Sequence, residues 1–462
     1  MKTAHVLSFC EDLDFSKIPP DILETTKRCL LDFVGVTFAG YQTEAGQTAL
    51  RSKSWFGTDG RCTVLGHAQL VSPLAAAFIN ATLGSSLDFD DGHRAATGHP
   101  GVMVIPVAMA AGELAPSSSG RDFFTALVAG YEVAIRCGVV MNSSQEKRFY
   151  GSGGWAVFGA SAAAAKLLGL EGQALRNAMT IGEVYGPTAQ CGKSITYGAM
   201  TKESIGWGAL TALFSVFLAQ EGFTGPGEIL LDEEDYDPSS KDIFQTLGKE
   251  FETGKVYFKT FPSCRWSHSP IAAALRIREQ HQLDPGGIKE VQVETFKKAL
   301  TLNHQSPTTT EQAQYSIPYT VAAALVSGEM EPRQVAEKNL RHPDILDLAK
   351  KVKLVHAPDL EHLYPAKRPA RVSVKMLDGG GYREEVHLLA GDPEFPLSRM
   401  QVIDKFEVCT APYMDKSWRE RIVQAVFTLE DMADIKEMTR LFRDPAIDPT
   451  MGKTNSAQRI RP

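Results

Sequence analysis

The sequence predicts a mainly α-helical protein with an inserted α+β domain. Apolar residues recur with helical spacing from about residue 18 to 260. Strand-like alternation of apolar and polar residues is confined to about 285–390, and helical spacing returns after Pro396. Because two helical stretches flank the mixed one, we expect the last helices to pack against the first.

The length of the chain sets the expected domain organisation. At 462 residues it is too long for one typical hydrophobic core, so two or three domains are expected. We predict a discontinuous helical domain from residues 1–260 and 400–450, with an α+β lid from 261–399. The last stretch, 451–462, has no apolar period and is predicted to be a disordered tail.

Proline and glycine mark the ends of the first predicted helices. Pro19-Pro20 opens a helix that ends at Gly40, and Ser72-Pro73 opens one that ends at Gly84. Many of the later helices are rich in Ala and Gly on most faces, which is typical of helices buried against close neighbours. Their sequences are VMVIPVAMAAGELA, GRDFFTALVAGYEVAIRCGVVM, FGASAAAAKLLGL and SIGWGALTALFSVFLAQEG.

The predicted lid alternates strands with helices. Strands are expected at 289–296 and 351–356, followed by a hairpin of 371–377 and 382–388 around a glycine turn. The helices between them are SPIAAALRIREQH, PYTVAAALVSG and HPDILDLAKKV. Beyond Pro396 come SRMQVIDKFEVCTAP, WRERIVQAVFTLEDM and DIKEMTRLF, which continue the helical domain.

Composition excludes several classes of function. A net charge of −7 argues against a broad basic face for nucleic acid. The 7 cysteines are scattered without CxxC spacing, which argues against a disulfide framework and a thiolate zinc site, and which fits a reducing cytoplasm. The N-terminus turns acidic before a signal-peptide core could form, and no window offers roughly 18 uninterrupted apolar residues for a membrane span.

The segment LDFDDGHRAATGHPG, residues 87–101, is the first candidate site. Three carboxylates and two imidazoles fall within twelve residues between two predicted helices. Loops at helix ends often carry function because a rigid scaffold positions them. A helix N-cap cluster with solvated histidines explains the same residues, and Asp and His can also bind metal, although no metal-ligand spacing supports that.

Three further segments collect residues that can do chemistry. Lys202 heads an apolar helix, where its charge is unfavourable toward the helix dipole; the alternative is a solvated lysine. FKTFPSCRWSH, 258–268, groups Lys, Cys, Arg and His where the helical part ends, as in an interdomain crevice or a linker with solvated basic residues. YSIPY, 315–319, opens a lid helix, and core aromatics explain it equally. No phosphate-binding, dinucleotide or nucleophile-elbow motif occurs.

Taken together, these segments resemble the MmgE/PrpD family, over about residues 5–440. The resemblance is strongest in LDFDDGH…GHPG, FGASAAAAKLLGL, MTKES…LAQEGFTGP, FKTFPSCRWSH and YSIPYTVAAALVSGEM. It implies a helical domain built from both chain ends, a smaller α+β lid, a homodimer, and no metal or organic cofactor. The family includes 2-methylcitrate dehydratase, cis-aconitate decarboxylase and iminodisuccinate epimerase.

The resemblance also implies a set of catalytic residues. Asp88 matches the first aspartate of the family's DFDD motif, and His99 matches the histidine of its HP motif. Lys202 matches the lysine after MT, and Lys259 the lysine before an aromatic-Pro pair. Tyr319 resembles the family's lid tyrosine.

For substrate binding we expect His93, Tyr150, Arg265 and His268. The sequence also departs from the family pattern. Gly92 stands where Thr or Ser is common, and Gly101 replaces the serine of HPS. Tyr150 or Ser152 stands where many members have histidine, and 203–205 read Glu-Ser-Ile rather than Pro-Leu-His. These changes remove polar and basic groups, so the usual tricarboxylate substrates are in doubt.

The implied reaction is proton transfer at the carbon next to a carboxylate of a small di- or tricarboxylate. Charge builds there on an anionic group, so the site must supply cations, and Lys202 and Lys259 are the candidates. His99 can exchange a proton near neutral pH, with Tyr319 or His93 helping at the leaving group. A 2-methylcitrate dehydratase-like hydro-lyase is expected first. Decarboxylation, epimerisation and non-catalytic metabolite binding are the alternatives.

Overall fold

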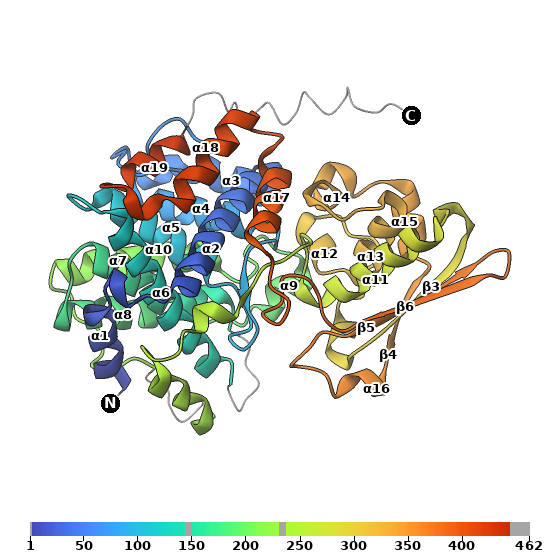
Figure 1. Ribbon diagram of the computed structural model, residues 1–462, viewed down its shortest axis with the longest axis horizontal. Coiled ribbons are helices and arrows are strands. Elements are labelled where there is room, and N and C mark those ends of the chain that lie inside the picture. Colours follow the sequence, from blue (N-terminus) through green and yellow to red (C-terminus); the bar gives the residue numbers. More distant parts are fainter. Residues whose placement is uncertain (1, 144–149, 231–236, 444–462) are drawn as a thin grey trace.

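The computed structural model describes residues 2–143, 150–230 and 237–443, so the predicted tail lies outside the described residues. Its chain forms a helical lobe and a smaller lobe with a sheet (Figure 1). The helices of the first lobe are α1 (Lys2–Asp12), α2 (Pro20–Ala39), α3 (Glu44–Arg51), α4 (Pro73–Ser85), α5 (Gly101–Leu114), α6 (Gly120–Met141), α7 (Ser152–Leu167), α8 (Gly172–Tyr185), α9 (Gly192–Tyr197), α10 (Ile205–Gln220), α17 (Arg399–Thr410), α18 (Lys416–Phe427) and α19 (Lys436–Leu441).

The other lobe carries the four-stranded sheet and its helices. They are α11 (Arg265–His281), β3 (Ile288–Thr295), α12 (Thr310–Gln314), α13 (Ile317–Ser327), α14 (Pro332–Val335), α15 (Pro343–Ala349), β4 (Val352–His356), α16 (Pro358–Glu361), β5 (Ala370–Met376) and β6 (Gly381–Val386). The predicted fold class, mainly α with a small α+β part, is confirmed. The domain boundaries near 260 and 400 stay a prediction.

Helix α7 lies at the centre of the helical lobe and packs against α5, α6, α8 and α10. Its residues from Ser152 to Ala165 are all buried. A Cβ atom on Gly159 would lie 2.0 Å from the carbonyl oxygen of Gly130 in α6. The backbones of α6 and α7 therefore touch, which explains the small residues seen in the sequence.

Helix α6 is also the one described helix long and apolar enough to cross a membrane by length and composition alone. However, 94% of its apolar window is buried inside the protein. Core helices of globular proteins meet the same test, so its apolar character is explained by packing.

The end of the chain returns to its beginning through α17, which packs along α2 (Figure 1). Lys405 of α17 is buried, and its Nζ lies 2.5 Å from Oδ1 of Asp32 in α2. The same Nζ donates a hydrogen bond of 2.5 Å to the carbonyl oxygen of Phe89. Helix α17 thus contacts both α2 and the loop that follows α4.

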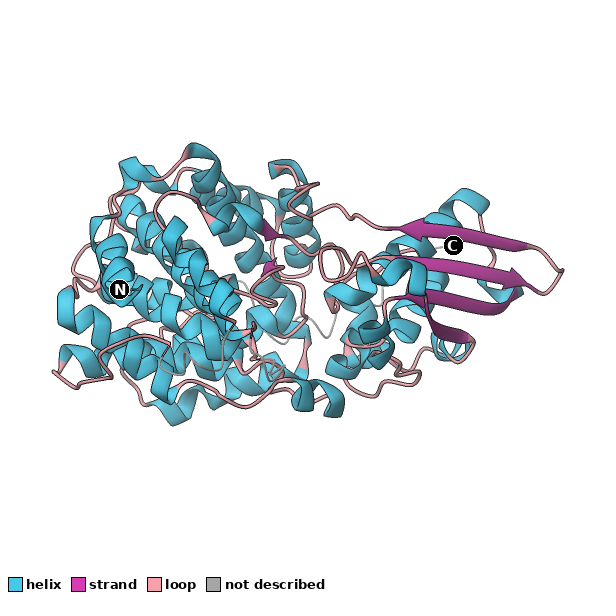
Figure 2. Cartoon of the chain, turned by 90° about the horizontal axis from the view of Figure 1, so that it is seen from below, coloured by secondary structure: helices cyan, strands magenta, loops and turns pink. Residues whose placement is uncertain are grey.

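The four strands lie in the order β4-β3-β5-β6 at one end of the molecule (Figure 2). β3 pairs parallel to β4 and antiparallel to β5, and β5 and β6 form the predicted hairpin around a glycine turn. Apolar side chains of β3 and β5, such as Val293 and Val372, join the core beneath α11 and α13.

One strand pair lies outside the region in which strands were predicted. β1 (Gly92–His93) and β2 (Val256–Tyr257) form a two-stranded antiparallel sheet within the larger lobe. Two-residue strands are too short to produce an alternating pattern, so the sequence does not reveal them. A Cβ on Gly92 would lie 2.4 Å from the Tyr257 hydroxyl oxygen, so glycine permits this approach. The pairing brings the loop after α4 next to Lys259.

Candidate active site

A pocket of about 580 Å³ opens where the two lobes meet. Asp88, His99 and Lys259 line it from the helical side, and Tyr315 and Arg368 line it from the lid side. His93 and Arg265 also reach its wall. The structure therefore gathers segments near 90, 260, 315 and 368 around one cavity.

The carboxylate of Asp88 is the centre of the cluster. Its Oδ1 lies 2.8 Å from Lys259 Nζ, 3.4 Å from His99 Nε2 and 3.9 Å from Lys202 Nζ. Lys259 Nζ also donates a 2.9 Å hydrogen bond to the backbone carbonyl of Asp88. Asp88 has a φ of 51°, a left-handed conformation that non-glycine residues rarely adopt. This strained turn aims the carboxylate at the two lysines.

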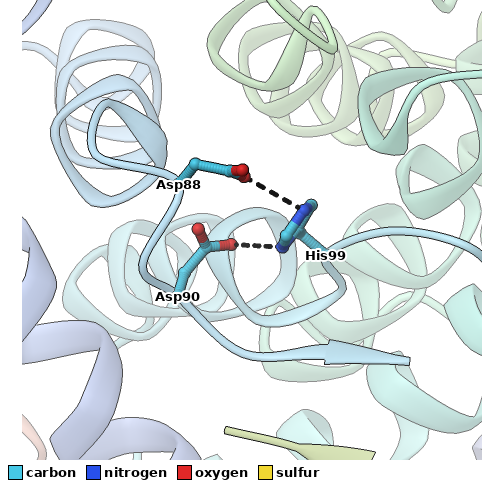
Figure 3. A group of neighbouring side chains, drawn as sticks. All are labelled: Asp88, Asp90 and His99. Atoms are coloured by element: carbon cyan, nitrogen blue, oxygen red, sulfur yellow. Dashed lines mark ion pairs between the residues drawn. The ribbon is translucent and has the colours of Figure 1, made fainter. Parts of the chain in front are cut away.

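His99 faces carboxylates on both sides of its ring (Figure 3). Its Nδ1 lies 3.0 Å from Asp90 Oδ2 and 2.8 Å from the carbonyl oxygen of Asp91. Because both neighbours accept hydrogen bonds, Nδ1 carries a proton and Nε2 faces the Asp88 side. Burial would lower the pKa of His99, but Asp90 and other carboxylates raise it to about 9.

Burial also opposes the charged forms of Asp88 and Lys259. Burial would raise the pKa of Asp88, yet Lys259 and Lys202 hold it well below its ordinary value. Burial would lower the pKa of Lys259, yet Asp88 raises it above the usual range. Each partner keeps the other ionised, so the cluster is a charged group at neutral pH.

Lys202 lies near Asp88 but does not line the pocket of about 580 Å³. Its Nζ donates to the Ser85 carbonyl oxygen at 2.6 Å and to Gln314 Oε1 at 3.0 Å. It lines a second cavity, of about 450 Å³, next to α10. Lys202 is therefore buried, and the alternative of a solvated lysine is wrong. Its contacts indicate that it supports Asp88 and joins the two lobes.

Asp91 fixes the loop that carries His99. It accepts hydrogen bonds from the Tyr131 hydroxyl at 2.6 Å and from the backbone N–H of Gly101 at 3.0 Å. Burial raises its pKa to about 6. Asp91 thus ties the start of α5 to α6 and has a structural role.

We expect Gly101→Ser to lower the free energy of unfolding by about 1–3 kcal/mol, the cost of leaving a buried polar group unpaired. A Cβ on Gly101 would lie 2.4 Å from the Tyr131 hydroxyl oxygen and 2.5 Å from Asp91 Oδ2. Urea titration measures the change. Gly227→Ser is the control because a Cβ there meets nothing within 4 Å. Equal stability of the two variants would contradict the prediction.

Asp88, Asp90 and His99 each offer a ligand atom, and these atoms lie within 4.8 Å of one another. This donor set could hold a metal ion. However, the ammonium group of Lys259 already occupies one side of Asp88 Oδ1 at 2.8 Å. A cation placed there would meet the repulsion of Lys259 and Lys202, so the cluster favours lysine as the source of positive charge.

Arg265 and His268, which were both predicted to bind substrate, contact each other. Arg265 lines the pocket, but its guanidinium donates to Asp392 Oδ1 at 2.6 Å and lies 2.9 Å from His268 Nδ1. His268 is fully buried, and burial, with Arg265 beside it, holds its pKa well below the ordinary value. His268 therefore supports Arg265 as a neutral group. His93 lines the wall, with Nε2 3.4 Å from Glu252 Oε2.

The structure places both predicted tyrosines away from the pocket. Tyr319 is fully buried in the lid core, and its hydroxyl donates to the Gln334 carbonyl oxygen at 2.7 Å. Tyr315, which lies four residues earlier and directly follows α12, lines the pocket instead. Tyr150 is half-buried and pairs its backbone with Gln190. Neither Tyr319 nor Tyr150 lines the cavity beside His99.

Glu203 and Arg368 line the pocket but were not predicted as site residues. Glu203 Oε1 lies 3.8 Å from His99 Nε2. Arg368 lies on the lid side, and its Nε is buried without a hydrogen-bond partner among the described residues. The replaced residues at 203–205 were the only sequence sign that Glu203 lies near the site.

Comparison with known proteins gives matches along nearly the whole chain. The family model of the MmgE/PrpD N-terminal domain matches residues 5–237, and that of the MmgE/PrpD C-terminal domain matches residues 261–431. A cis-aconitate decarboxylase of Mus musculus is 28% identical over 96% of this chain and 94% of its own length. Those of Homo sapiens and Aspergillus terreus are 27% and 26% identical, over 92% and 97% of this chain and 91% and 97% of their own lengths.

Proposed function

The chain belongs to the MmgE/PrpD family, and on this premise we propose that it is a cofactor-independent lyase acting on a small di- or tricarboxylate. One observation carries the proposal. A histidine whose pKa is raised to about 9 faces a pocket beside a buried lysine–carboxylate pair. Such a group can deliver a proton to carbon while the cation offsets negative charge on the substrate.

Decarboxylation is the reaction that these residues favour, rather than the dehydration expected first. Dehydration needs a base at carbon and an acid at the leaving hydroxyl, whereas decarboxylation needs one proton donor. His99 holds its proton at neutral pH, and Asp88 is a weak base because two lysines stabilise its charge. The names of the compared relatives, which are cis-aconitate decarboxylases, support the same choice.

In the proposed reaction the bond between carbon and a carboxylate breaks, and carbon dioxide leaves. The electron pair stays on carbon and spreads into the adjoining unsaturated or carboxylate group. Lys259 stabilises this negative charge, and the preorganised cation needs no rearrangement as the charge develops. His99 Nε2 then donates a proton to that carbon, which balances the loss of carbon dioxide, and His99 regains a proton from solvent.

Incubation with a panel of di- and tricarboxylates in heavy water, followed by NMR, tests the proposed function. Decarboxylation yields carbon dioxide and a product with one solvent deuterium on the carbon that is protonated after the carboxylate leaves. Loss of water would instead indicate a dehydratase, and deuterium exchange without net product an epimerase. Binding without any exchange would indicate a non-catalytic protein. The same panel with EDTA tests the metal alternative, and unchanged turnover is expected.

We expect kcat/KM to fall as the pH rises through about 9. The imidazolium form of His99 is the proton donor, and it is populated below its pKa, which the neighbouring carboxylates raise to about 9. Rates across roughly pH 6–10 at low substrate concentration report groups of the free enzyme. If His99 instead acts as a base, kcat/KM would rise through the same pH range, which would contradict the assignment.

A further inference from the structure

Glu203 is a buried carboxylate beside His99 that no part of the proposed reaction uses. It is 6% exposed and lines the pocket. Its Oε2 accepts hydrogen bonds from the backbone N–H of Ser152 at 3.0 Å and from the Ser152 hydroxyl at 2.6 Å. Its Oε1 lies 3.8 Å from His99 Nε2, the ring atom that faces the pocket. One oxygen is therefore anchored, and the other is directed at the imidazole.

Ser152 connects the same carboxylate to the backbone of His99. The Ser152 hydroxyl has one proton, which it donates to Glu203, and its oxygen accepts a 2.8 Å hydrogen bond from the backbone N–H of His99. Glu203 thus contacts His99 twice, through Ser152 at the backbone and directly at the ring. A movement of the Glu203 carboxylate would therefore disturb both the backbone and the ring of His99.

The backbone on both sides of Glu203 has an unusual conformation and is closely packed. Lys202 and Ser204, on either side, have φ values of 40° and 59°, which are unusual for non-glycine residues. Gly151 and Gly153 allow the start of α7 to approach, because a Cβ on either would lie within 3.0 Å of Glu203 backbone atoms. Strained backbone held by close packing is common where a side chain must be aimed.

Glu203 differs from Asp88, the other carboxylate on the Nε2 side of His99, in its charged partners. Asp90 and the carbonyl of Asp91 face the Nδ1 side of the ring, and Asp88 and Glu203 face the Nε2 side. Asp88 is neutralised by Lys259 and, more distantly, by Lys202. Among the described residues, Glu203 has no lysine or arginine partner; its contacts are with Ser152 and His99. Within that part of the chain, the ion pair of Glu203 is therefore the one with the imidazole of His99.

From this arrangement we propose that Glu203 is a positioning residue that orients His99 and keeps it in its protonated, donor form. The catalytic part of this role rests on the proposed function. The electrostatic part does not, because it concerns the free protein. Glu203, together with Asp90, therefore extends to higher pH the range over which His99 can act.

Titration of the His99 ring by NMR in the free protein tests the inference. Protein with isotope-labelled histidine contains 11 such rings, and loss of one signal in His99→Gln assigns His99. Glu203→Gln keeps the shape and an acceptor for Ser152 but removes the charge. We expect the pKa of His99 to fall by about 1–3 units, the usual effect of one nearby charge. The alkaline limb of kcat/KM should move to lower pH with it.

Two further variants make the result decisive. Glu203→Asp keeps the charge and should restore most of the pKa. Glu113→Gln is the control, because Glu113 also accepts from the backbone N–H and hydroxyl of one residue, Thr63, though with a different oxygen for each, and it does not line the pocket. An unchanged His99 pKa in Glu203→Gln, or equal falls in Glu203→Gln and Glu203→Asp, would overturn the inference. A fall without activity on any carboxylate would retain it and reject the proposed function.

Discussion

His99→Asn is expected to lower kcat by about 10²–10⁴-fold, the contribution of a well-placed general acid. Asparagine can still donate to the carbonyl of Asp91 on the Nδ1 side, so the loop should keep its shape. It cannot deliver a proton to carbon from the Nε2 side. Because the carboxylate-binding cations stay in place, KM should change much less than kcat.

Steady-state rates of product formation measure this effect, and His67→Asn is the control. His67 is a half-buried histidine of the same lobe that contacts Gln69 and does not line the pocket. Its variant should retain the activity of the unmodified protein. A loss of less than about tenfold in His99→Asn would remove His99 from the proton-transfer step.

Lys259→Met is expected to have the largest effect on stability. It removes the cation 2.8 Å from Asp88, whose side chain is only 4% exposed. Breaking one side of a buried ion pair costs about 3–5 kcal/mol, because the remaining charge is left in a medium of low polarity. The same change removes the charge that stabilises the developing carbanion, so turnover should fall as well.

The double variant Asp88→Asn/Lys259→Met separates these two consequences. Without the orphaned carboxylate, the free energy of unfolding, measured with urea, should return toward that of the original protein. Activity should not return, because the ammonium group of Lys259 is still missing beside His99. A double variant as unstable as Lys259→Met alone would show that the lost stability has a source other than the charge of Asp88.

Local sequence patterns are enough to predict many of the helices and strands. The helices with proline at the start and glycine at the end, such as α2 and α4, appear within a few residues of their predicted bounds. The strands of the lid do too, because one face of the sheet is buried and the alternation is clear. The pair β1 and β2 could not be predicted, since it depends on Gly92 meeting Tyr257 across the fold.

The sequence predicts the site residues that lie in short motifs. It does not predict which of several neighbouring side chains points into the pocket. Asp88, His99 and Lys259 come together as the motifs imply. Tyr315 and Tyr319 lie four residues apart, at the end of α12 and in α13, and the packing of the lid determines which one reaches the pocket. Glu203 could not be identified because its partner Ser152 is 51 residues away.

The bond from Lys405 to the loop at Phe89 spans 316 positions of the chain. The ribosome therefore makes the loop 316 residues before it makes Lys405. The growing polypeptide lacks this support for the loop until α17 has been synthesised. A chain that stops before Lys405 would lack the bond, however well its first helices fold. The order of synthesis thus makes the loop at Phe89 depend on a helix that is made much later.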